Sequence, residues 1–212
     1  MAELDLHEQE QVDAFRAWWK ENGNWVIGIV LLGALAFAGS QYWRNHQAGQ
    51  AADASKLYGE VLQQVETRDA KRIGDAADAL ANRYGSSAYA PRAQLLAAQA
   101  SLQAGDAARA KVQLLWVIEH ADETAIQHTA RLKLASVLLD QGQYDAALQQ
   151  LAAKHSDTFA SLYADLKGDV LLVMGKKDEA RAAWQLALDK MDAKITYRSL
   201  IQLKLDGLGS AQ

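Results

Sequence analysis

The sequence predicts an all-α protein, with a single N-terminal transmembrane helix followed by a solenoid of helical hairpins. Three observations support this fold class. Residues 25–43 form an uncharged apolar run, the composition is rich in Ala, Leu and Gln with only one proline, and glycines recur at a nearly constant spacing in the second half of the chain. Such a composition is typical of helices, so we expect almost no strand.

The apolar run, WVIGIVLLGALAFAGSQYW, has no charged residue between Glu21 and Arg44. As a helix it would be roughly 28 Å long, close to the hydrocarbon thickness of a bilayer, and all its backbone polar groups would be paired internally. Trp25 and Trp43 lie at its two ends, where aromatic rings favour the headgroup region. The pattern predicts contact with the lipid bilayer from Trp25 to Trp43.

A buried core helix and a cleaved signal peptide are the alternatives to a membrane anchor. Ala36-Phe37-Ala38 resembles a signal-peptidase site, but the preceding segment is long and acidic and the apolar run continues past Ala38. A core helix would keep one polar face, and this run has none. We therefore favour an uncleaved anchor, although counting Lys and Arg on the two sides gives no orientation.

Residues 1–24 are predicted to form a tail that contains a short amphipathic helix. Val12, Phe15, Trp18 and Trp19 recur at spacings of three and four, and Asn22-Gly23-Asn24 is expected to break the helix. Two interpretations remain open. The helix either lies on the membrane surface as part of the anchor or serves as a docking site for a partner.

The charge of the chain is unevenly placed. The tail has six acidic and two basic residues, which accounts for the whole net charge of −4 and leaves twenty of each sign from Arg44 onward. Without a basic patch, nucleic acid is not expected as a partner. The chain has no cysteine, which excludes disulfides and thiol chemistry.

Residues 44–212 are expected to form one helical domain. It would start with helices Gln47–Val65 and Ala70–Tyr84, the second ended by Gly85 in a left-handed conformation. Pro91 is expected to open the next helix at a position where its missing N–H costs nothing, with Ser86 and Ser87 available as turn or capping residues.

Gly105, Gly142 and Gly175 then lie 37 and 33 residues apart, each between two apolar periodic segments. These separations bracket the period of a tetratricopeptide repeat, about 34 residues arranged as a helix, a turn and a helix. Small residues such as Gly168 and Ala180 fall where paired helices should touch. The alternative is an irregular helical bundle. A last helix from Ala193 to Leu205, capped by Asp192, would shield the final repeat.

We find no residues with a catalytic, cofactor-binding or metal-binding pattern. The five histidines are scattered, and His120 and His128 are expected to be solvated loop residues. No phosphate-binding loop, nucleophile elbow or H-E-x-x-H motif occurs. The chain is therefore not expected to be an enzyme or to bind a cofactor.

A partner-binding surface is predicted on the first helix of each repeat, because these helices line the concave face of such solenoids. The turn glycines define the register. The predicted residues are Arg92, Leu95, Gln99, Leu102, Gln103, Thr129, Leu132, Ser136, Leu139, Asp140, Leu162, Asp165, Asp169, Leu172 and Val173. An equally weighted alternative buries Leu95, Leu132 and Leu162 between helices.

Several segments together resemble the YfgM family of ancillary subunits of the bacterial Sec translocon. They are Glu10-Gln11-Val12-Asp13, Trp18-Trp19, Glu21-Asn22-Gly23, Tyr42-Trp43-Arg44, the loop from Tyr84 to Ala90, and Leu203-Lys204-Leu205-Asp206. The resemblance implies a single-pass protein of the bacterial inner membrane, with a cytoplasmic N-terminus and a periplasmic tetratricopeptide-like domain.

It further implies an interaction scaffold that binds the SecYEG translocon and helps hand translocated proteins to periplasmic chaperones, including a membrane-anchored isomerase-like chaperone. No catalytic residues carry over from the family. The alternative function is a membrane-tethered regulator whose acidic cytoplasmic tail binds a signalling protein.

Overall fold

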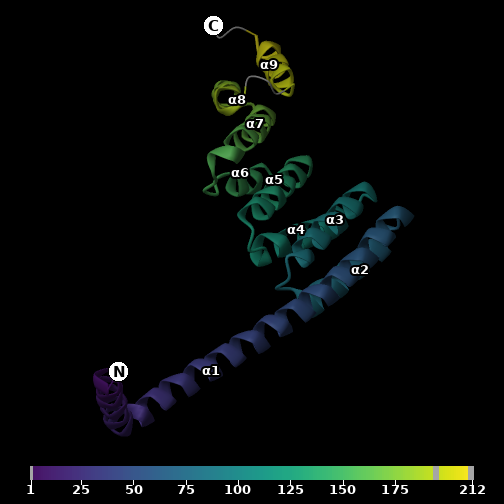
Figure 1. Cartoon of the computed structure of the whole chain (residues 1–212). Helices are drawn as coiled ribbons and strands as arrows, with labels where there is room; N and C mark the ends of the chain where they lie inside the picture. The colour runs from purple at the N-terminus through teal and green to yellow at the C-terminus, as the bar shows by residue number, and fades with distance from the viewer. Residues whose placement is uncertain (1, 193–195, 210–212) are drawn as a thin grey trace. The chain divides into compact units, whose positions relative to one another are not determined.

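The computed structural model describes residues 2–192 and 196–209, with side chains from residue 10 onward (Figure 1). This part of the chain forms nine α-helices and contains no strand. The helices are α1 (Ala2–Thr67), α2 (Ala70–Tyr84), α3 (Tyr89–Gln103), α4 (Ala107–His120), α5 (Thr124–Asp140), α6 (Tyr144–Leu151), α7 (Asp157–Val173), α8 (Lys177–Lys190) and α9 (Arg198–Gly207). The all-α prediction is confirmed.

Helix α1 is longer than the sequence pattern predicted. The chain divides into two compact units, Met1–Ala52 and Asp53–Gln212, and α1 runs through the boundary. The expected break at Asn22-Gly23-Asn24 is wrong, since the helix continues through these residues. The expected separate helix Gln47–Val65 is likewise the last part of α1. Helical hydrogen bonding continues because none of the intervening residues is a proline.

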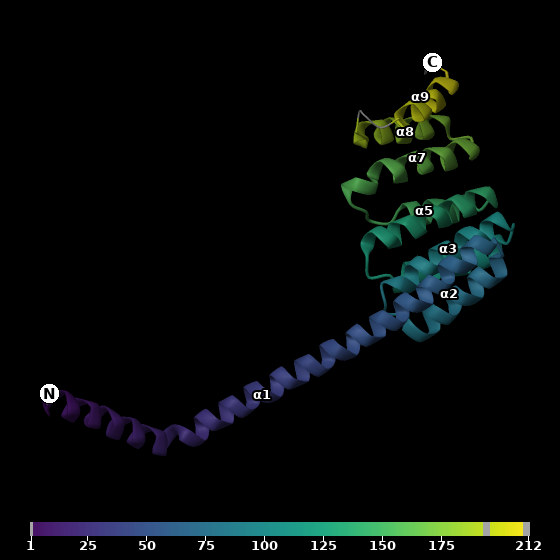
Figure 2. The same cartoon turned by 45° about the vertical axis from the view of Figure 1, so that its right-hand side comes forward.

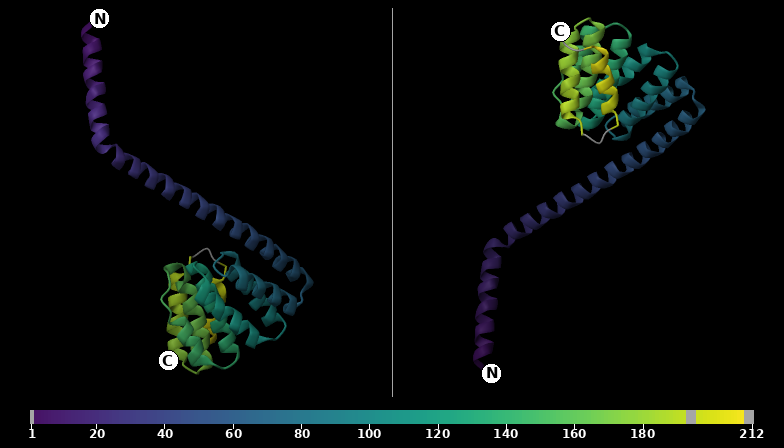
Figure 3. Two further views of the ribbon diagram at one scale, coloured as in Figure 1. Left: turned by 90° about the horizontal axis from the view of Figure 1, so that it is seen from below. Right: turned by 90° about the horizontal axis from the view of Figure 1, so that it is seen from above.

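In the first unit, the purple N-terminal part of α1 meets the following part at a clear bend (Figure 3). Within this segment, the side-chain amide of Asn22 donates to the carbonyl of Trp18 at 3.1 Å. Side chains that bond to helix carbonyls, and glycines such as Gly23, are common causes of helix bends. The helix therefore continues through the predicted break, with this local contact inside it.

The apolar run lies on α1 with its side chains outward. Leu32 and Leu35 are 69% and 70% exposed, and Trp25 is 77% exposed. Among the described residues, α1 is long and apolar enough to cross a membrane, and only 6% of its apolar window is buried. This exposure contradicts the core-helix alternative, because a core helix would be covered by protein.

The second unit is a stack of antiparallel helix pairs (Figure 2). The end of α1 pairs with α2, and then α3 with α4, α5 with α6, and α7 with α8, while α9 packs on α8. The first helices of successive pairs are also neighbours, as α3 contacts α5 and α5 contacts α7. This arrangement is the helical-hairpin solenoid that the sequence predicted.

The three turn glycines adopt the left-handed conformation, with φ of +80° at Gly105, +70° at Gly142 and +78° at Gly175. In each turn the residue after the glycine donates its N–H to a carbonyl five residues earlier, as Lys176 does to Leu171 at 2.9 Å. This is the Schellman cap, which favours glycine because the left-handed conformation crowds a Cβ. The predicted repeat register is therefore confirmed at its turns.

The predicted cap at the end of α2 is wrong. Gly85 has φ of −58° and does not end α2 in a left-handed conformation. Ser86 and Ser87 lie in the turn that follows, one of the two roles expected of them, and the backbone N–H of Ser87 bonds to the carbonyl of Tyr84 at 2.9 Å. Helix α3 begins at Tyr89, with Pro91 in its first turn, and its N-cap residue Ala88 makes no side-chain cap.

Three apolar clusters hold the stack together. The end of α1 packs with α2 and α3, a central cluster joins α3 to α7, and a third joins α7, α8 and α9. Trp184 is the largest fully buried side chain, and its indole lies against the backbone of Gly168. A Cβ at Gly168 would lie 2.5 Å from Cδ1 of Trp184. The predicted close contact between α7 and α8 thus requires glycine.

The last helix differs from its predicted bounds. It begins at Arg198 rather than at Ala193, after a turn at Thr196 and Tyr197. The predicted start, residues 193–195, lies outside the described residues. Ile201 and Leu205 of α9 are buried against α7 and α8, which is the shielding role expected of this helix.

Candidate functional site

A groove of about 400 Å³ runs between the C-terminal halves of α3 and α5. Its lining combines polar side chains with apolar ones such as Leu102 and Val137. The lining residues are Gln99, Leu102, Gly105, Ala107, Lys133, Ser136, Val137, Asp140 and Gln141.

The two helices are tied together across the groove. The ammonium of Lys133 on α5 donates to the side-chain oxygen of Gln99 on α3 at 2.8 Å. Val137 is only 4% exposed because it packs into the central apolar cluster. The groove therefore presents polar side chains next to apolar ones.

A second hollow, of about 350 Å³, lies on the other side of α3. It is lined by Val65, Arg68, Ile73, Leu96, Gln99, Ala100, Gln103 and Ala104. Gln99 borders both hollows, so they flank the same stretch of α3. Amide side chains are prominent in both.

The structure brings together part of the predicted partner-binding set. Gln99, Leu102, Ser136 and Asp140 share the groove, and Gln103 lines the second hollow. The sequence reasoning missed Lys133, although it lies one helical turn before Ser136 and Val137 on the same helix.

Other predicted residues of α3 and α5 are engaged within the fold. Three leucines are half-buried against the central cluster, namely Leu95, Leu132 and Leu139. For Leu95 and Leu132 this agrees with the alternative that places them between helices. Arg92 forms an ion pair with Glu123 at 2.8 Å, and the Thr129 hydroxyl donates to the carbonyl of Ala125. The guanidinium of Arg92 lowers the pKa of the Glu123 carboxyl.

The predicted residues of α7 are divided between two environments. Leu162, Leu172 and Val173 are exposed, so the alternative that buries Leu162 between helices is wrong. Asp165 is only 5% exposed, which contradicts its predicted place on an open surface. Helix α9 covers it, since the Tyr197 hydroxyl donates to Asp165 at 2.8 Å.

Asp169 is also engaged by α9. The Lys204 ammonium lies 2.7 Å from Asp169 and 2.9 Å from Asp165, so one cation serves two carboxylates. Burial raises the pKa of Asp169 more than the shared lysine lowers it. Burial also acts to lower the pKa of Lys204, but hydrogen bonds to Asp169 and Asp165 outweigh it and raise that pKa.

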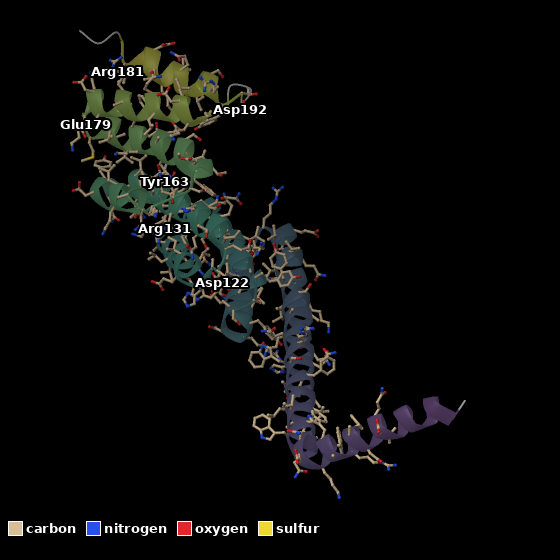
Figure 4. The ribbon with its side chains drawn as sticks, turned by 60° about the vertical axis from the view of Figure 1, so that its left-hand side comes forward. Asp122, Arg131, Tyr163, Glu179, Arg181 and Asp192 are labelled. Atoms are coloured by element: carbon tan, nitrogen blue, oxygen red, sulfur yellow. The ribbon has the colours of Figure 1, made fainter. Side chains whose placement is uncertain are left out.

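His128 is not the solvated loop residue that we predicted. It lies within α5, is 4% exposed, and its Nδ1 is 2.8 Å from the Tyr163 hydroxyl on α7. Burial lowers the pKa of His128, and nearby His155 and Arg131 lower it further. Figure 4 shows Tyr163 and Arg131 in the middle of the stack. No local sequence pattern indicates this contact, because it joins residues 35 positions apart.

Within the described residues, no group of three or more His, Asp or Glu side chains is placed to hold a metal ion. The groove contains one lysine and one aspartate but no nucleophile paired with a base. Its chemistry is that of a surface that binds polar and apolar groups together.

Comparison with known proteins gives the family. A family described as "Tetratricopeptide repeat-like domain" matches residues 16–210. A protein of Neisseria gonorrhoeae is 32% identical over 204 residues, which is 96% of this chain and 98% of the relative. A protein of Escherichia coli K12 is 30% identical over 206 residues, 97% of this chain and 98% of the relative. Both relatives are named "Ancillary SecYEG translocon subunit".

The chain belongs to the YfgM family. A third member, from Haemophilus influenzae, is 28% identical over 96% of this chain and carries the same name. The YfgM match includes the apolar run and all of the helix pairs, so it covers both compact units.

Proposed function

We propose that this protein is a membrane-anchored interaction scaffold associated with the Sec translocon. It helps hand translocated polypeptides to periplasmic chaperones, including a membrane-anchored isomerase-like chaperone. Its N-terminus is cytoplasmic and its helix-pair domain periplasmic, in the bacterial inner membrane. The name shared by the three relatives and their nearly full-length match support the association with the translocon.

The observation that carries the scaffold role is the groove shared by Gln99, Leu102, Ser136 and Asp140. Amide and hydroxyl groups can both donate to and accept from the main chain of a bound segment. Leu102 and Val137 offer apolar contact beside them. Such a surface fits an extended or helical protein segment and requires no particular ligand charge.

Site-specific photo-crosslinking in cells tests this function. Probes replace Gln99, Ser136 or Asp140 in the groove, and matched probes replace the exposed second-helix residues Glu119, Gln149 and Gln185. We do not place a probe at Asp169, because its ion pair with Lys204 would be lost. We expect several-fold higher yields of translocon or chaperone adducts from the groove probes.

Equal yields from both sets, with the protein still folded, would contradict the groove assignment.

A second measurement addresses the partner itself. Purification of the full chain in mild detergent should recover translocon and chaperone subunits. Recovery of a cytoplasmic signalling protein in their place would favour a tethered regulator that acts through the acidic tail.

A further inference from the structure

The tail part of α1 carries an exposed cluster of aromatic rings. Phe15, Trp18 and Trp19 are 60%, 49% and 43% exposed, and Val12 on the same face is 49% exposed. The Phe15 ring lies 6.2 Å from that of Trp18 and 6.0 Å from that of Trp19, while the two indoles are 6.5 Å apart. These side chains therefore form one continuous apolar face, which no protein segment covers among the described residues.

The charged residues of this segment are placed on the remaining faces of the helix. Arg16 and Lys20 border a shallow hollow with Phe15, Ala17 and Trp19. Arg16 also pairs with Asp13 at 3.4 Å, with both side chains exposed. Acids and bases are thus mixed around the aromatic cluster, and the segment offers no polybasic surface.

The junction with the apolar run is held by local contacts. Gly23 is the only buried residue between residues 10 and 52, because the indole of Trp19 lies against it. A Cβ at Gly23 would lie 3.2 Å from Nε1 of Trp19, tighter than ordinary contact. Together with the bond from Asn22 to the Trp18 carbonyl, this contact holds the Trp19 indole against the helix just before the apolar run.

We propose that residues 10–22 bind the surface of the lipid bilayer, with Val12, Phe15, Trp18 and Trp19 inserted at the boundary between headgroups and acyl chains. The uncharged run begins at Trp25, six residues after Trp19 and thirteen after Val12, so the cluster lies about 9 to 20 Å from the start of this run along the helix. Indole rings favour this boundary because they combine an apolar body with a polar N–H.

The mixed charges of this segment indicate which class of lipid is sufficient for its binding. Attraction of a helix to anionic lipid requires an excess of Lys and Arg, whereas residues 10–22 contain Glu10, Asp13 and Glu21 against Arg16 and Lys20. Binding therefore depends on the aromatic face, and zwitterionic lipid is enough. This surface is independent of the groove in the second unit.

Single-cysteine labelling can test the proposal directly, since the chain has no native cysteine. The full chain is placed in nanodiscs of zwitterionic phosphatidylcholine, with a spin label at Val12→Cys or Phe15→Cys on the apolar face. Labels at Asp13→Cys and Ala17→Cys, on the polar side, are the matched controls. Collision of each label with oxygen and with a water-soluble nickel chelate is measured by power saturation.

We expect the ratio of oxygen to nickel collision rates to be at least three-fold higher for labels at Val12 and Phe15 than for the two control labels. The contrast should be the same when a third of the lipid is anionic. Trp18→Glu with Trp19→Glu should abolish it, whereas Ala14→Glu with Ala17→Glu should not. Circular dichroism checks that both double variants keep their helix content.

Three outcomes would overturn the proposal. Equal nickel access at all four sites would mean that the helix lies in water. Protection of Val12 and Phe15 from both reagents would mean that protein, such as a second copy of the chain, covers the face. A contrast that appears only with anionic lipid would mean that charge, and not the aromatic cluster, drives the binding.

Discussion

The ammonium of Lys204 on α9 donates to Asp169 on α7 at 2.7 Å. Lys133 on α5 donates in the same way to Gln99 on α3, at 2.8 Å. Gln99 and Asp169 each lie six residues before a turn glycine, so they are equivalent positions in two repeats. The lysines also share their neighbours, Leu132-Lys133-Leu134 and Leu203-Lys204-Leu205. Helix α9 therefore occupies the place of a first helix of a further repeat.

This equivalence predicts the effect of removing the lysine of α9. Lys204→Met should destabilise the protein by about 3 kcal/mol, because Asp165 and Asp169 would remain largely buried without a cation. Thermal unfolding of the full chain in detergent, followed by circular dichroism, measures the change. Lys190→Met is the control. Its partner Asp157 is 93% exposed, so that substitution should cost less than about 0.5 kcal/mol. Similar losses in the two variants would contradict the role of Lys204.

The contact of Gly168 with Trp184 predicts strong sensitivity to any side chain. Gly168→Leu should cost about 3 kcal/mol or more, and Ala180→Leu about 1 to 3 kcal/mol, since both sites are closely packed. Gly59→Ala in α1 is the matched control. A Cβ there meets nothing within 4 Å, so alanine should stabilise the helix by about 0.5 to 1 kcal/mol. Unchanged unfolding temperatures for both large substitutions would refute the packing of α7 on α8.

Arg68 predicts a stabilising substitution. It follows α1 with φ of +56°, the only described residue other than glycine with a positive φ. That conformation costs about 1 kcal/mol for a residue with a Cβ, so Arg68→Gly should raise the free energy of unfolding by up to this amount. Arg83→Gly, inside α2, is a control that should lower it by about 1 kcal/mol. Urea unfolding in detergent compares the two variants with the native chain.

The lowered pKa of His128 predicts weaker stability in mild acid. Burial keeps this imidazole neutral in the folded state, whereas in the unfolded chain it gains a proton below its ordinary pKa of 6.5. The unfolded state then binds more protons, so the free energy of unfolding should fall as pH drops below 6.5. His128→Phe should make the unfolding temperature less dependent on pH between about 6.5 and 5. An unchanged pH dependence would show that His128 does not contribute.

The proposed topology predicts which side of the membrane holds each end. Alkaline phosphatase fused after Gln212 should be active, because the helix-pair domain is proposed to be periplasmic. N-terminal sequencing should find no cleavage after Ala38. An inactive fusion, with the protein present in the membrane, or a mature protein that begins at Gly39 would contradict this topology.

Much of the fold could be predicted from the sequence because the deciding interactions are local. The bounds of α2 were predicted to the residue, and the turns at Gly105, Gly142 and Gly175 were predicted from the spacing of these glycines. Helical periodicity and the freedom of glycine at positive φ act over a few residues. The pattern of one uncharged helix followed by helix pairs therefore follows from the chain alone.

Only the tertiary structure decided which side chains are free to bind a partner. Asp169 and Ser136 each lie six residues before a turn glycine, yet α9 covers part of Asp169 and pairs with it through Lys204, while Ser136 is exposed at an open groove. His128 was likewise buried by Tyr163 from another helix. Burial at each of these sites depends on a segment more than thirty residues away. A single sequence carries no periodic signal for such contacts, whereas the three-dimensional packing determines them directly.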